Sequence, residues 1–326
     1  FDLPQQKRED GQVPIFSSSG ITGTHSTAMV KAPGVITGRY GTIGEVFYAA
    51  KDFWPLNTTL FVEDFHGNDA KFIYYFLKTL EWSKFTSASA VPGINRNTVH
   101  KEIVSLPDIE TQRRIASTLS MFDEKIKINT EINDNLQQQA QAIYSSMFID
   151  NPDPAWSHGH LSDLITVKYG KDHKKLADGI YPVYGSGGIM RYVERPLYNK
   201  ESVLIPRKGT LNNVMYVNQP FWSVDTMFYT EMKLPNVAKF VYHFVKAKDL
   251  ASMNAGSAVP SMTTDILNAM EVVIPSASAL EEFESLVAPM YEAMEANDVQ
   301  SKALSQMRDT LLPKLMSGEI DVSDIQ

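Results

Sequence analysis

A regular pattern of apolar positions runs through residues Glu110–Phe148, which contain no Pro or Gly. The apolar residues follow alternating steps of four and three, at Ile115, Leu119, Phe122, Ile126, Leu136, Ala140, Ile143 and Met147. This spacing is typical of the contact stripe of a coiled coil. The same steps place Asn129 and Asn133 at its centre, so the middle of the stripe is polar. The pattern predicts a helix about 57 Å long that needs a helical partner.

The chain contains an internal repeat at an offset of 168 residues. The paired segments are VITGRYGTIGEVFY from Val35 and VLIPRKGTLNNVMY from Val203, AKFIYYFLK from Ala70 and AKFVYHFVK from Ala238, and SAVP at Ser89–Pro92 and Ser257–Pro260. Phe1 matches Tyr169, so Ala155–Lys168 has no counterpart in the first copy. We therefore expect a strand or turn before Phe1.

The repeat also supplies the partner helix. The stepped pattern recurs within Ala279–Met316, at Phe283, Val287, Met290, Met294, Leu304, Leu311 and Leu315. Asn297 and Ser301 take the two central polar positions. Each copy is thus predicted to be a globular unit followed by a long helix.

Within each copy the local patterns predict a mixed α/β domain. The expected strands are Gly34–Thr37, Glu45–Ala50, Thr59–Val62, Ser202–Ile205, Val214–Asn218 and Met227–Glu231, and the expected helices are Asp69–Leu80 and Asn236–Lys248. Loops are expected at Ser17–Ser26, Gly93–Thr98 and Gly185–Tyr192, and a linker at Asp150–Pro154. The predicted fold is α+β, with domains at 1–108 and 151–276, long helices at 109–150 and 277–317, and a tail at 318–326.

Composition narrows the class of protein. The chain of 326 residues is 43% apolar, enough for about two globular domains. It has no Cys and no apolar run long enough to cross a bilayer, which favours a cytoplasmic protein. The net charge of -8 argues against a nucleic-acid partner at first sight, but residues 277–326 alone carry 3 basic and 10 acidic groups. The two larger domains are nearly neutral, so DNA binding is permitted without being demonstrated.

Few residues offer catalytic chemistry. Asp153, Asp172 and Lys174 nominally fit a nuclease pattern, but the pattern is permissive, and the other copy has Pro4, Gln5 and Gln6 where a second site would stand. Asn151–Pro154 does not match the loop of an amino-directed methyltransferase, and no phosphate-binding loop is present. His158 and His160 lack a third metal ligand at a telling spacing, which favours a solvated loop.

The repeat does offer a pair of Arg-containing turns between predicted strands. They contain Arg39, Tyr40 and Thr42 in the first copy and Arg207, Lys208 and Thr210 in the second. An Arg at an exposed turn can form two hydrogen bonds to a guanine edge or bind phosphate. The alternative is that Gly41 and Gly209 set hairpin turns while the Arg is solvated or structural.

Polar positions differ between the copies in their loops. The candidate DNA-contacting residues at these positions are Ser18, Ser19, Asn57, Asn95 and Arg96 in the first copy and Ser186, Asn212, Asp225 and Thr263 in the second. A shared framework with different polar loops suggests two similar domains with different specificities. Ordinary drift between duplicated copies is the alternative for each position.

The chain resembles the DNA specificity subunits of type I restriction-modification systems over essentially its whole length. The most specific segments are Leu106-Pro107 leading into Gln112-Arg113-Arg114-Ile115, and Leu311–Ile320. The repeated Arg-x-Gly-Thr and Ser-Ala-Val-Pro segments are also similar to that family. The second helix departs from the pattern, because it begins Ala279-Leu280-Glu281-Glu282-Phe283 without the Gln-Arg pair. That departure leaves open which contacts its start makes.

The resemblance implies an antiparallel coiled coil with pseudo-twofold symmetry and a target-recognition domain for each half of a bipartite, asymmetric site in double-stranded DNA. Such pairing would bring Asn129 and Asn133 opposite Ser301 and Asn297. It also implies a non-catalytic chain without cofactor of its own. Two methyltransferase subunits would bind S-adenosylmethionine, and restriction/translocase subunits would use ATP and Mg.

Two rival functions remain open at the level of sequence. One is a coiled-coil scaffold whose end domains bind protein or glycan, and the other is the nuclease built on Asp153, Asp172 and Lys174. On the specificity-subunit hypothesis, the acidic C-terminal segment suits a protein partner better than phosphate, through Glu281, Glu282, Glu284, Glu292 and Glu295.

Overall fold

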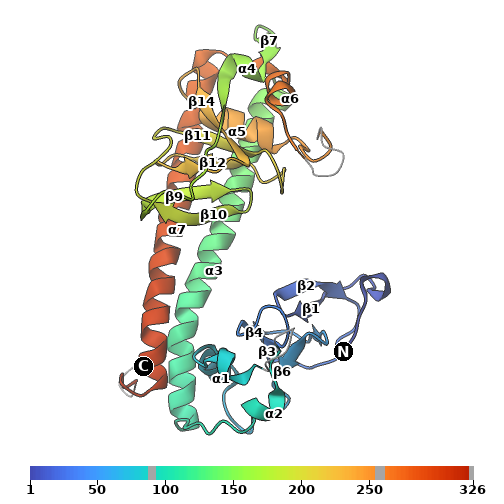
Figure 1. Cartoon of the computed structure of the whole chain (residues 1–326). Coiled ribbons are helices and arrows are strands. Elements are labelled where there is room, and N and C mark those ends of the chain that lie inside the picture. The colour runs from blue at the N-terminus through green and yellow to red at the C-terminus, as the bar shows by residue number, and fades with distance from the viewer. Residues whose placement is uncertain (87–92, 254–260, 323–326) are drawn as a thin grey trace. The chain divides into compact units, whose positions relative to one another are not determined.

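The structure is a computed structural model that describes residues 1–86, 93–253 and 261–322. The two SAVP segments lie outside the described residues. The internal contacts divide the chain into unit 1, formed by Phe1–Thr130 with Asn297–Gln326, and unit 2, formed by Glu131–Ala296. Both units include part of the long helices α3 (Ile109–Ser145) and α7 (Ala277–Met316) (Figure 1).

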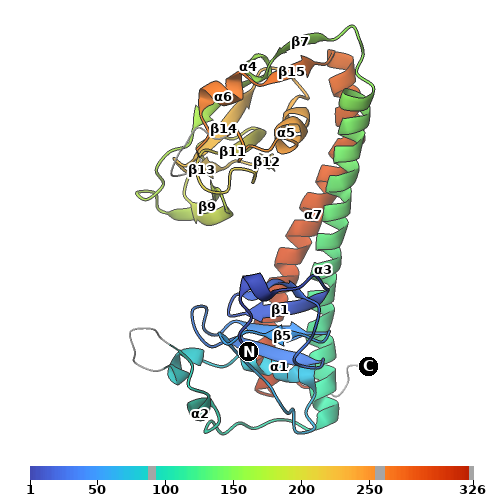
Figure 2. The same cartoon turned by 90° about the vertical axis from the view of Figure 1, so that its right-hand side faces the viewer.

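Unit 1 combines small sheets with short helices. One sheet has the order β4-β3-β6 and the other β2-β1-β5, where β1 and β2 are antiparallel and β1 and β5 are parallel. Helix α1 lies beside the long helices in this unit, where Phe72 and Tyr75 share a core cluster with Ile115 (Figure 2). The elements are η1 (Gln5–Lys7), β1 (Val13–Ser17), β2 (Gly20–His25), β3 (Gly34–Gly38), β4 (Val46–Ala49), β5 (Trp54–Pro55), β6 (Thr59–Phe61), α1 (Ala70–Lys78), η2 (Trp82–Phe85) and α2 (Arg96–Val99).

Unit 2 repeats this plan and extends it. Its sheets have the orders β12-β11-β14-β8, β10-β9-β13 and β15-β7. Strand β8 pairs antiparallel with β14, in the segment that has no counterpart in the first copy. The elements are the π-helix η3 (Ser146–Asp150), β7 (Ser157–His160), α4 (Leu161–Leu164), β8 (Ile165–Tyr169), β9 (Asp178–Gly185), β10 (Gly188–Val193), β11 (Ser202–Pro206), β12 (Met215–Val217), β13 (Trp222–Ser223), β14 (Met227–Met232), α5 (Ala238–Lys246), α6 (Thr264–Asn268) and β15 (Glu271–Ile274).

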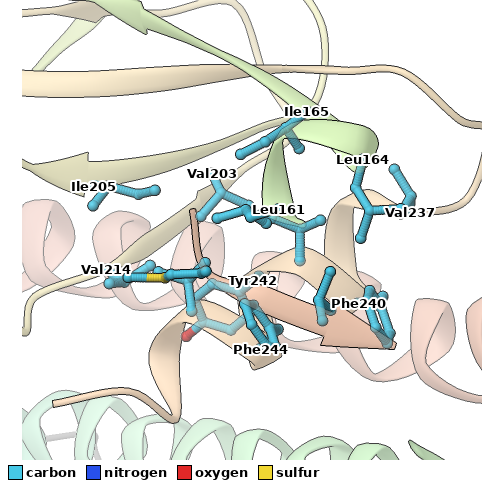
Figure 3. Close-up of a cluster of buried hydrophobic side chains, with 14 of the residues drawn as sticks. Leu161, Leu164, Ile165, Val203, Ile205, Val214, Val237, Phe240, Tyr242 and Phe244 are labelled. Carbon is cyan, nitrogen blue, oxygen red and sulfur yellow. The ribbon is translucent and has the colours of Figure 1, made fainter. Parts of the chain in front are cut away.

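The core of unit 2 lies between a helix and the sheet. Phe240, Tyr242 and Phe244 of α5 gather with Val203 of β11 and Leu161 of α4 (Figure 3). Every residue of α5 from Ala238 to Val245 is buried, because one face meets the sheet and another meets the long helices. Each fully buried apolar side chain contributes about 1.5 to 3 kcal/mol to folding.

The start of α3 is fixed by side-chain hydrogen bonds. The Asp108 carboxylate accepts from the backbone N–H groups of Glu110 and Thr111, both at 3.0 Å, which is the geometry of an N-cap. Gln112 is buried, accepts from the Asp69 N–H at 2.9 Å, and donates to Asn68 Oδ1 at 2.7 Å. The Gln of the Gln-Arg entry therefore attaches α3 to the start of α1. Its counterpart Leu280 is buried in the core of unit 2, so an apolar contact replaces this polar one.

The predicted pairing of the long helices is confirmed. In unit 1, Ile115 and Leu119 of α3 share a cluster with Leu312 and Leu315 of α7. In unit 2, Tyr144 of α3 shares a cluster with the N-terminal part of α7, so the two helices run antiparallel in each unit. The polar centre is present as well. In unit 1, Asn129 Nδ2 donates to the Asn297 carbonyl at 3.3 Å and to Ser301 Oγ at 3.1 Å, and in unit 2, Asn133 Nδ2 donates to the Met294 carbonyl at 3.2 Å.

The predicted strands and amphipathic helices are confirmed to within a few residues, but the predicted loops are only partly correct. Ser17–Ser26 contains strand β2, Gly185–Tyr192 contains most of β10, and Gly93–Thr98 runs into α2. The reason is visible in β2, where only the two end residues are buried. A strand held mainly by backbone pairing shows no alternation of apolar residues, so the sequence pattern does not predict it.

Among the described residues, no helix combines the length and apolar character needed to cross a membrane.

Candidate nucleic-acid interface

The Arg39 turn of unit 1 is the meeting point of several loops. The Arg39 N–H donates to the Thr58 carbonyl at 2.8 Å, and the Ile94 N–H donates to the Arg39 carbonyl at 2.9 Å. Tyr40 and Gly93 form an isolated β-bridge. Ser18 Oγ lies 3.4 Å from the position that a Cβ on Gly41 would occupy. The turn therefore contacts segments that are far from it in sequence.

Backbone hydrogen bonds at the Arg39 turn leave its side chains exposed. Arg39, Tyr40 and Thr42 are all exposed, as are Asn57 and Arg96 in the adjoining segments. The Arg39 guanidinium lies 4.8 Å from the centre of the Tyr40 ring. Such a cation–π contact orients the guanidinium without using any of its N–H donors. Unit 1 thus presents an oriented Arg among exposed polar groups.

Unit 2 builds the same arrangement at Arg207. The Arg207 N–H donates to the Thr226 carbonyl at 2.9 Å, and the Met262 N–H donates to the Arg207 carbonyl at 2.9 Å. Lys208 and Ser261 form a β-bridge. The Asn213 side chain donates to the Ser186 carbonyl at 2.8 Å, which attaches the β9–β10 turn to this cluster. The two copies of the repeat therefore use equivalent backbone contacts to hold the turn.

The glycines of the two turns are required by backbone geometry. Gly41 has φ +77° and Gly209 has φ +86°, a region that L side chains rarely adopt. This confirms the structural role predicted for both glycines. Gly93 is needed for a different reason, because a Cβ there would lie 2.4 Å from the Tyr40 ring.

The remaining candidates fall into two groups. Three have structural bonds. Asn95 caps α2 by accepting from Asn97 N–H, Thr263 caps α6 by accepting from Ile266 N–H, and Asn212 donates to Asp249 Oδ1. These hydrogen bonds give the three side chains a structural role that does not require bound DNA. Ser19, Lys208, Thr210 and Asp225 are exposed, and Ser18 and Ser186 are half-buried. The carbonyl of Asp225 accepts from Arg207 Nη1 at 3.3 Å, so Asp225 adjoins the Arg207 turn.

One residue that contacts Arg207 escaped the sequence-based search. The Arg207 guanidinium lies 5.3 Å from the centre of the Tyr169 ring, and Tyr169 is 52% exposed at the end of β8. The repeat contains a signal for this contact. Tyr40 of unit 1 corresponds to Lys208, so unit 2 lacks an aromatic neighbour beside its Arg. Tyr169 supplies the ring from another strand.

The alternative catalytic and metal sites receive no support from the described residues. Asp172 accepts a hydrogen bond from the Lys174 N–H at 3.0 Å, and this bond lowers the pKa of the exposed carboxyl group. His158 and His160 lie on strand β7 rather than in the predicted loop, because β7 pairs with β15 through its backbone. Within residues 1–86, 93–253 and 261–322, no group of three or more His, Cys, Asp or Glu side chains could hold a metal ion.

Comparison with known families assigns the chain to a class. A model of the type I restriction modification DNA specificity domain matches residues 2–138 and 155–283, which together form more than half of the chain. The chain therefore belongs to this family, and it is a specificity subunit of the type I restriction-modification kind.

Individual relatives agree with the family assignment. The chain is 24% identical over 307 residues to the type I restriction enzyme MjaIX specificity subunit of Methanocaldococcus jannaschii, covering 79% of this chain and 71% of that protein. It is 21% identical over 357 residues to the HindI specificity subunit of Haemophilus influenzae, covering 74% and 75%. The crystal structure of a type I restriction-modification S subunit from M. genitalium shares the fold, with a TM-score of 0.62, 20% identity and coverage of 96% and 91%.

Proposed function

We propose that this chain reads a bipartite, asymmetric DNA target, with the Arg39 cluster contacting one half-site and the Arg207 cluster the other. The observation that carries the proposal is the repeated convergence of loops on each Arg. In both units backbone hydrogen bonds fix the Arg residue of the turn, and the neighbouring polar side chains are mostly exposed, while Arg207 itself is half-buried. Arg in this setting can form bidentate hydrogen bonds with the O6 and N7 atoms of guanine.

The difference between the two clusters supports an asymmetric target. Asn57 stands in unit 1 where Asp225 stands in unit 2, and Arg96 where Thr264 stands. Amide, carboxylate and guanidinium groups favour different base edges, since Asn pairs with adenine and a carboxylate accepts from the cytosine amino group. Two equivalent frameworks with these different groups would prefer different half-sites.

The chain acts in this proposal through partner subunits. Two methyltransferase subunits carrying S-adenosylmethionine would modify adenines in the two half-sites, and restriction/translocase subunits would use ATP and Mg. The acidic face of α7 is the proposed protein-docking surface. Glu281, Glu282 and Glu292 are exposed there, whereas Glu284 forms an ion pair with Lys239 and Glu295 accepts from Asn218. The proposed docking surface therefore consists of Glu281, Glu282 and Glu292.

Selection from a random-sequence DNA pool tests the proposed function. The full chain is assembled with methyltransferase subunits, and bound duplexes are recovered and sequenced. Enrichment of one sequence in two fixed parts separated by a random spacer is expected. The double variant Arg39→Ala, Arg207→Ala serves as the control and should lose enrichment in both parts. Recovery of DNA with no common sequence by the unaltered complex would contradict the proposal.

A further inference from the structure

A basic loop lies beside the Arg207 cluster in unit 2. Tyr169, whose ring faces the Arg207 guanidinium, is followed by Gly170 and then by Lys171-Asp172-His173-Lys174-Lys175. The Gly170 N–H donates to the Met227 carbonyl at 3.0 Å, and the Lys171 N–H donates to the Ser223 carbonyl at 2.8 Å. Ser223 is two residues from Asp225, whose carbonyl accepts from Arg207. The loop therefore begins next to the base-reading cluster.

Both ends of this loop are anchored in the protein. Trp222 Nε1 donates to the Lys171 carbonyl at 2.8 Å. At the other end Leu176 is buried in a core cluster, and its carbonyl accepts from Arg191 Nη2 at 2.9 Å. Asp172 closes the loop internally through its bond to the Lys174 N–H. A loop held in this way loses little conformational freedom when it binds a ligand.

The lysine side chains of the loop are exposed and form no salt bridge in the described part of the chain, although Lys174 interacts electrostatically with Asp172. Lys171, Lys174 and Lys175 are exposed, and none of them takes part in the ion pairs found in the described part of the chain. The only carboxylate in the loop is Asp172, which is occupied by the backbone of Lys174. Three ammonium groups against one such carboxylate give the loop an excess of positive charge, which suits a polyanion.

The first copy of the repeat lacks this loop chemistry. The residues equivalent to Lys171–Lys175 are Leu3–Lys7, which include a single lysine. Leu3 is buried and Gln5–Lys7 form the short helix η1. The next residue, Arg8, donates to the Thr22 carbonyl at 2.7 Å. The basic loop is thus specific to unit 2, although the reading turn is common to both units.

We propose that Lys171, Lys174 and Lys175 form a phosphate-binding loop that holds the DNA backbone beside the bases contacted by the Arg207 cluster. This inference rests on the proposed function, because it assigns a second role at the same DNA site. Contacts to phosphate position a protein on DNA without reading sequence, whereas contacts to base edges specify it. Unit 2 therefore supplies more of the sequence-independent affinity than unit 1 does.

Salt dependence of binding distinguishes phosphate contacts from other roles. Each phosphate contact releases counterions, so the slope of log affinity against log salt concentration changes by about 0.9 per contact. The triple variant Lys171→Gln, Lys174→Gln, Lys175→Gln is expected to reduce the slope by about 2 to 3. Its affinity should fall by the same factor for the selected target duplex and for an unrelated duplex of equal length, so discrimination is unchanged.

Two further variants make the result specific to the loop. The triple Lys→Arg variant at the same positions keeps the charges and should retain the slope of the unaltered protein. The variant Lys51→Gln, Lys125→Gln, Lys200→Gln removes three other exposed lysines and should change the slope much less. Melting curves of all variants, in the complex with methyltransferase subunits, confirm that the fold is intact.

The possible results distinguish a failure of the loop proposal from a failure of the proposed function. An unchanged slope in the triple Gln variant, together with normal discrimination by the unaltered complex, overturns the loop proposal alone. A loss confined to the target duplex also overturns it, because the lysines would then read bases. If the unaltered complex does not discriminate between duplexes, the proposed function itself fails.

Discussion

Lys71 and Lys239 occupy the same position of the repeat but have opposite environments. The Lys239 side chain is 6% exposed, with its ammonium group 2.6 Å from Glu284 and 3.3 Å from Glu201, and it faces the rings of Tyr216 and Tyr291. Lys71 is 39% exposed and pairs with Glu124 at 3.2 Å. The residues equivalent to Glu201 and Glu284 in unit 1 are Pro33 and Ala116.

The space around the lysine differs accordingly. In unit 1, Lys71 lines a pocket of about 620 Å³ between β4, α1 and α3, together with Tyr48 and Asp123. The position equivalent to Asp123 in unit 2 is Tyr291, which is buried in the core. The repeated residues therefore determine the fold of each copy, whereas a few unrepeated residues decide whether the junction between domain and helix is filled.

The largest difference between the two units is expected when each lysine is replaced by alanine. Lys239→Ala leaves Glu201 and Glu284 without their cation and should lower the free energy of unfolding by about 3 kcal/mol. Lys71→Ala is the matched control, and its exposed pair should contribute at most about 1 kcal/mol. Urea unfolding of both variants measures the difference, and equal losses would contradict the distinction drawn between the two junctions.

Replacing each of the two turn arginines should weaken binding to a different half-site. Arg207→Ala is expected to weaken recognition of one half-site by about 1 to 3 kcal/mol, and Arg39→Ala that of the other half-site. Affinities for duplexes altered in one half or the other measure the effect. If either variant loses affinity equally on all sequences, its arginine contacts phosphate rather than a base.

His243 in unit 2 should make stability depend on pH. His243 is buried, with Nδ1 2.8 Å from Gln141 Oε1 and Nε2 3.0 Å from the Tyr291 hydroxyl, and burial lowers its pKa from 6.5 to about 4. Because the unfolded chain binds the proton first, stability is retained above pH 6.5 and is lost as the pH falls toward 4.

The expected loss is about 1.4 kcal/mol per pH unit within that range. Chemical unfolding of the unaltered protein and of His243→Gln between pH 7 and 4.5 measures it, and the variant should have the smaller slope. The equivalent residue Tyr75 does not titrate in this range, because a phenol is neutral below pH 7 and burial raises its pKa further. Parallel pH profiles for the two proteins would contradict this origin of the slope.

The smallest effect is expected from the aromatic rings beside the arginines. Tyr169→Ala should weaken binding at the Arg207 half-site by about 0.5 to 1 kcal/mol, because the guanidinium loses its cation–π contact. Tyr169→Phe keeps the ring and should bind nearly as well as the unaltered protein. Tyr40→Ala should affect the Arg39 half-site instead. A loss at both half-sites from Tyr169→Ala would indicate a general structural defect.

The strands and long helices could be predicted from the sequence because each pattern occurs in both copies of the repeat. The strands around Arg39 and Arg207 and the polar centre at Asn129 follow from paired observations in one register. The second buried face, on α3 and the following η3, was not predicted, because Tyr144 and Phe148 lie off the coiled-coil stripe and pack against Phe240. Their burial depends on where the domain docks, which the helical period does not encode.

Contacts between segments that are distant in sequence explain why the role of Tyr169 at the site was not predicted. Tyr169 and Arg207 are 38 positions apart and meet only because β8 and β11 both pair with β14. Conversely, Asn95, Asn212 and Thr263 looked available for DNA, but their side chains cap helices or hold a loop. Short polar side chains serve both purposes equally well, so composition alone does not separate them.

Mapping methylated adenines shows whether this chain specifies a bipartite DNA target. The full chain is combined with methyltransferase subunits and S-adenosylmethionine, and a random-sequence DNA library is treated and sequenced for modified adenine. We expect modification at one recurring asymmetric sequence with an adenine in each of two separated parts, relaxed in one part by Arg39→Ala and in the other by Arg207→Ala. Modification at no recurring sequence, or at the same sequence when this chain is omitted, would contradict it.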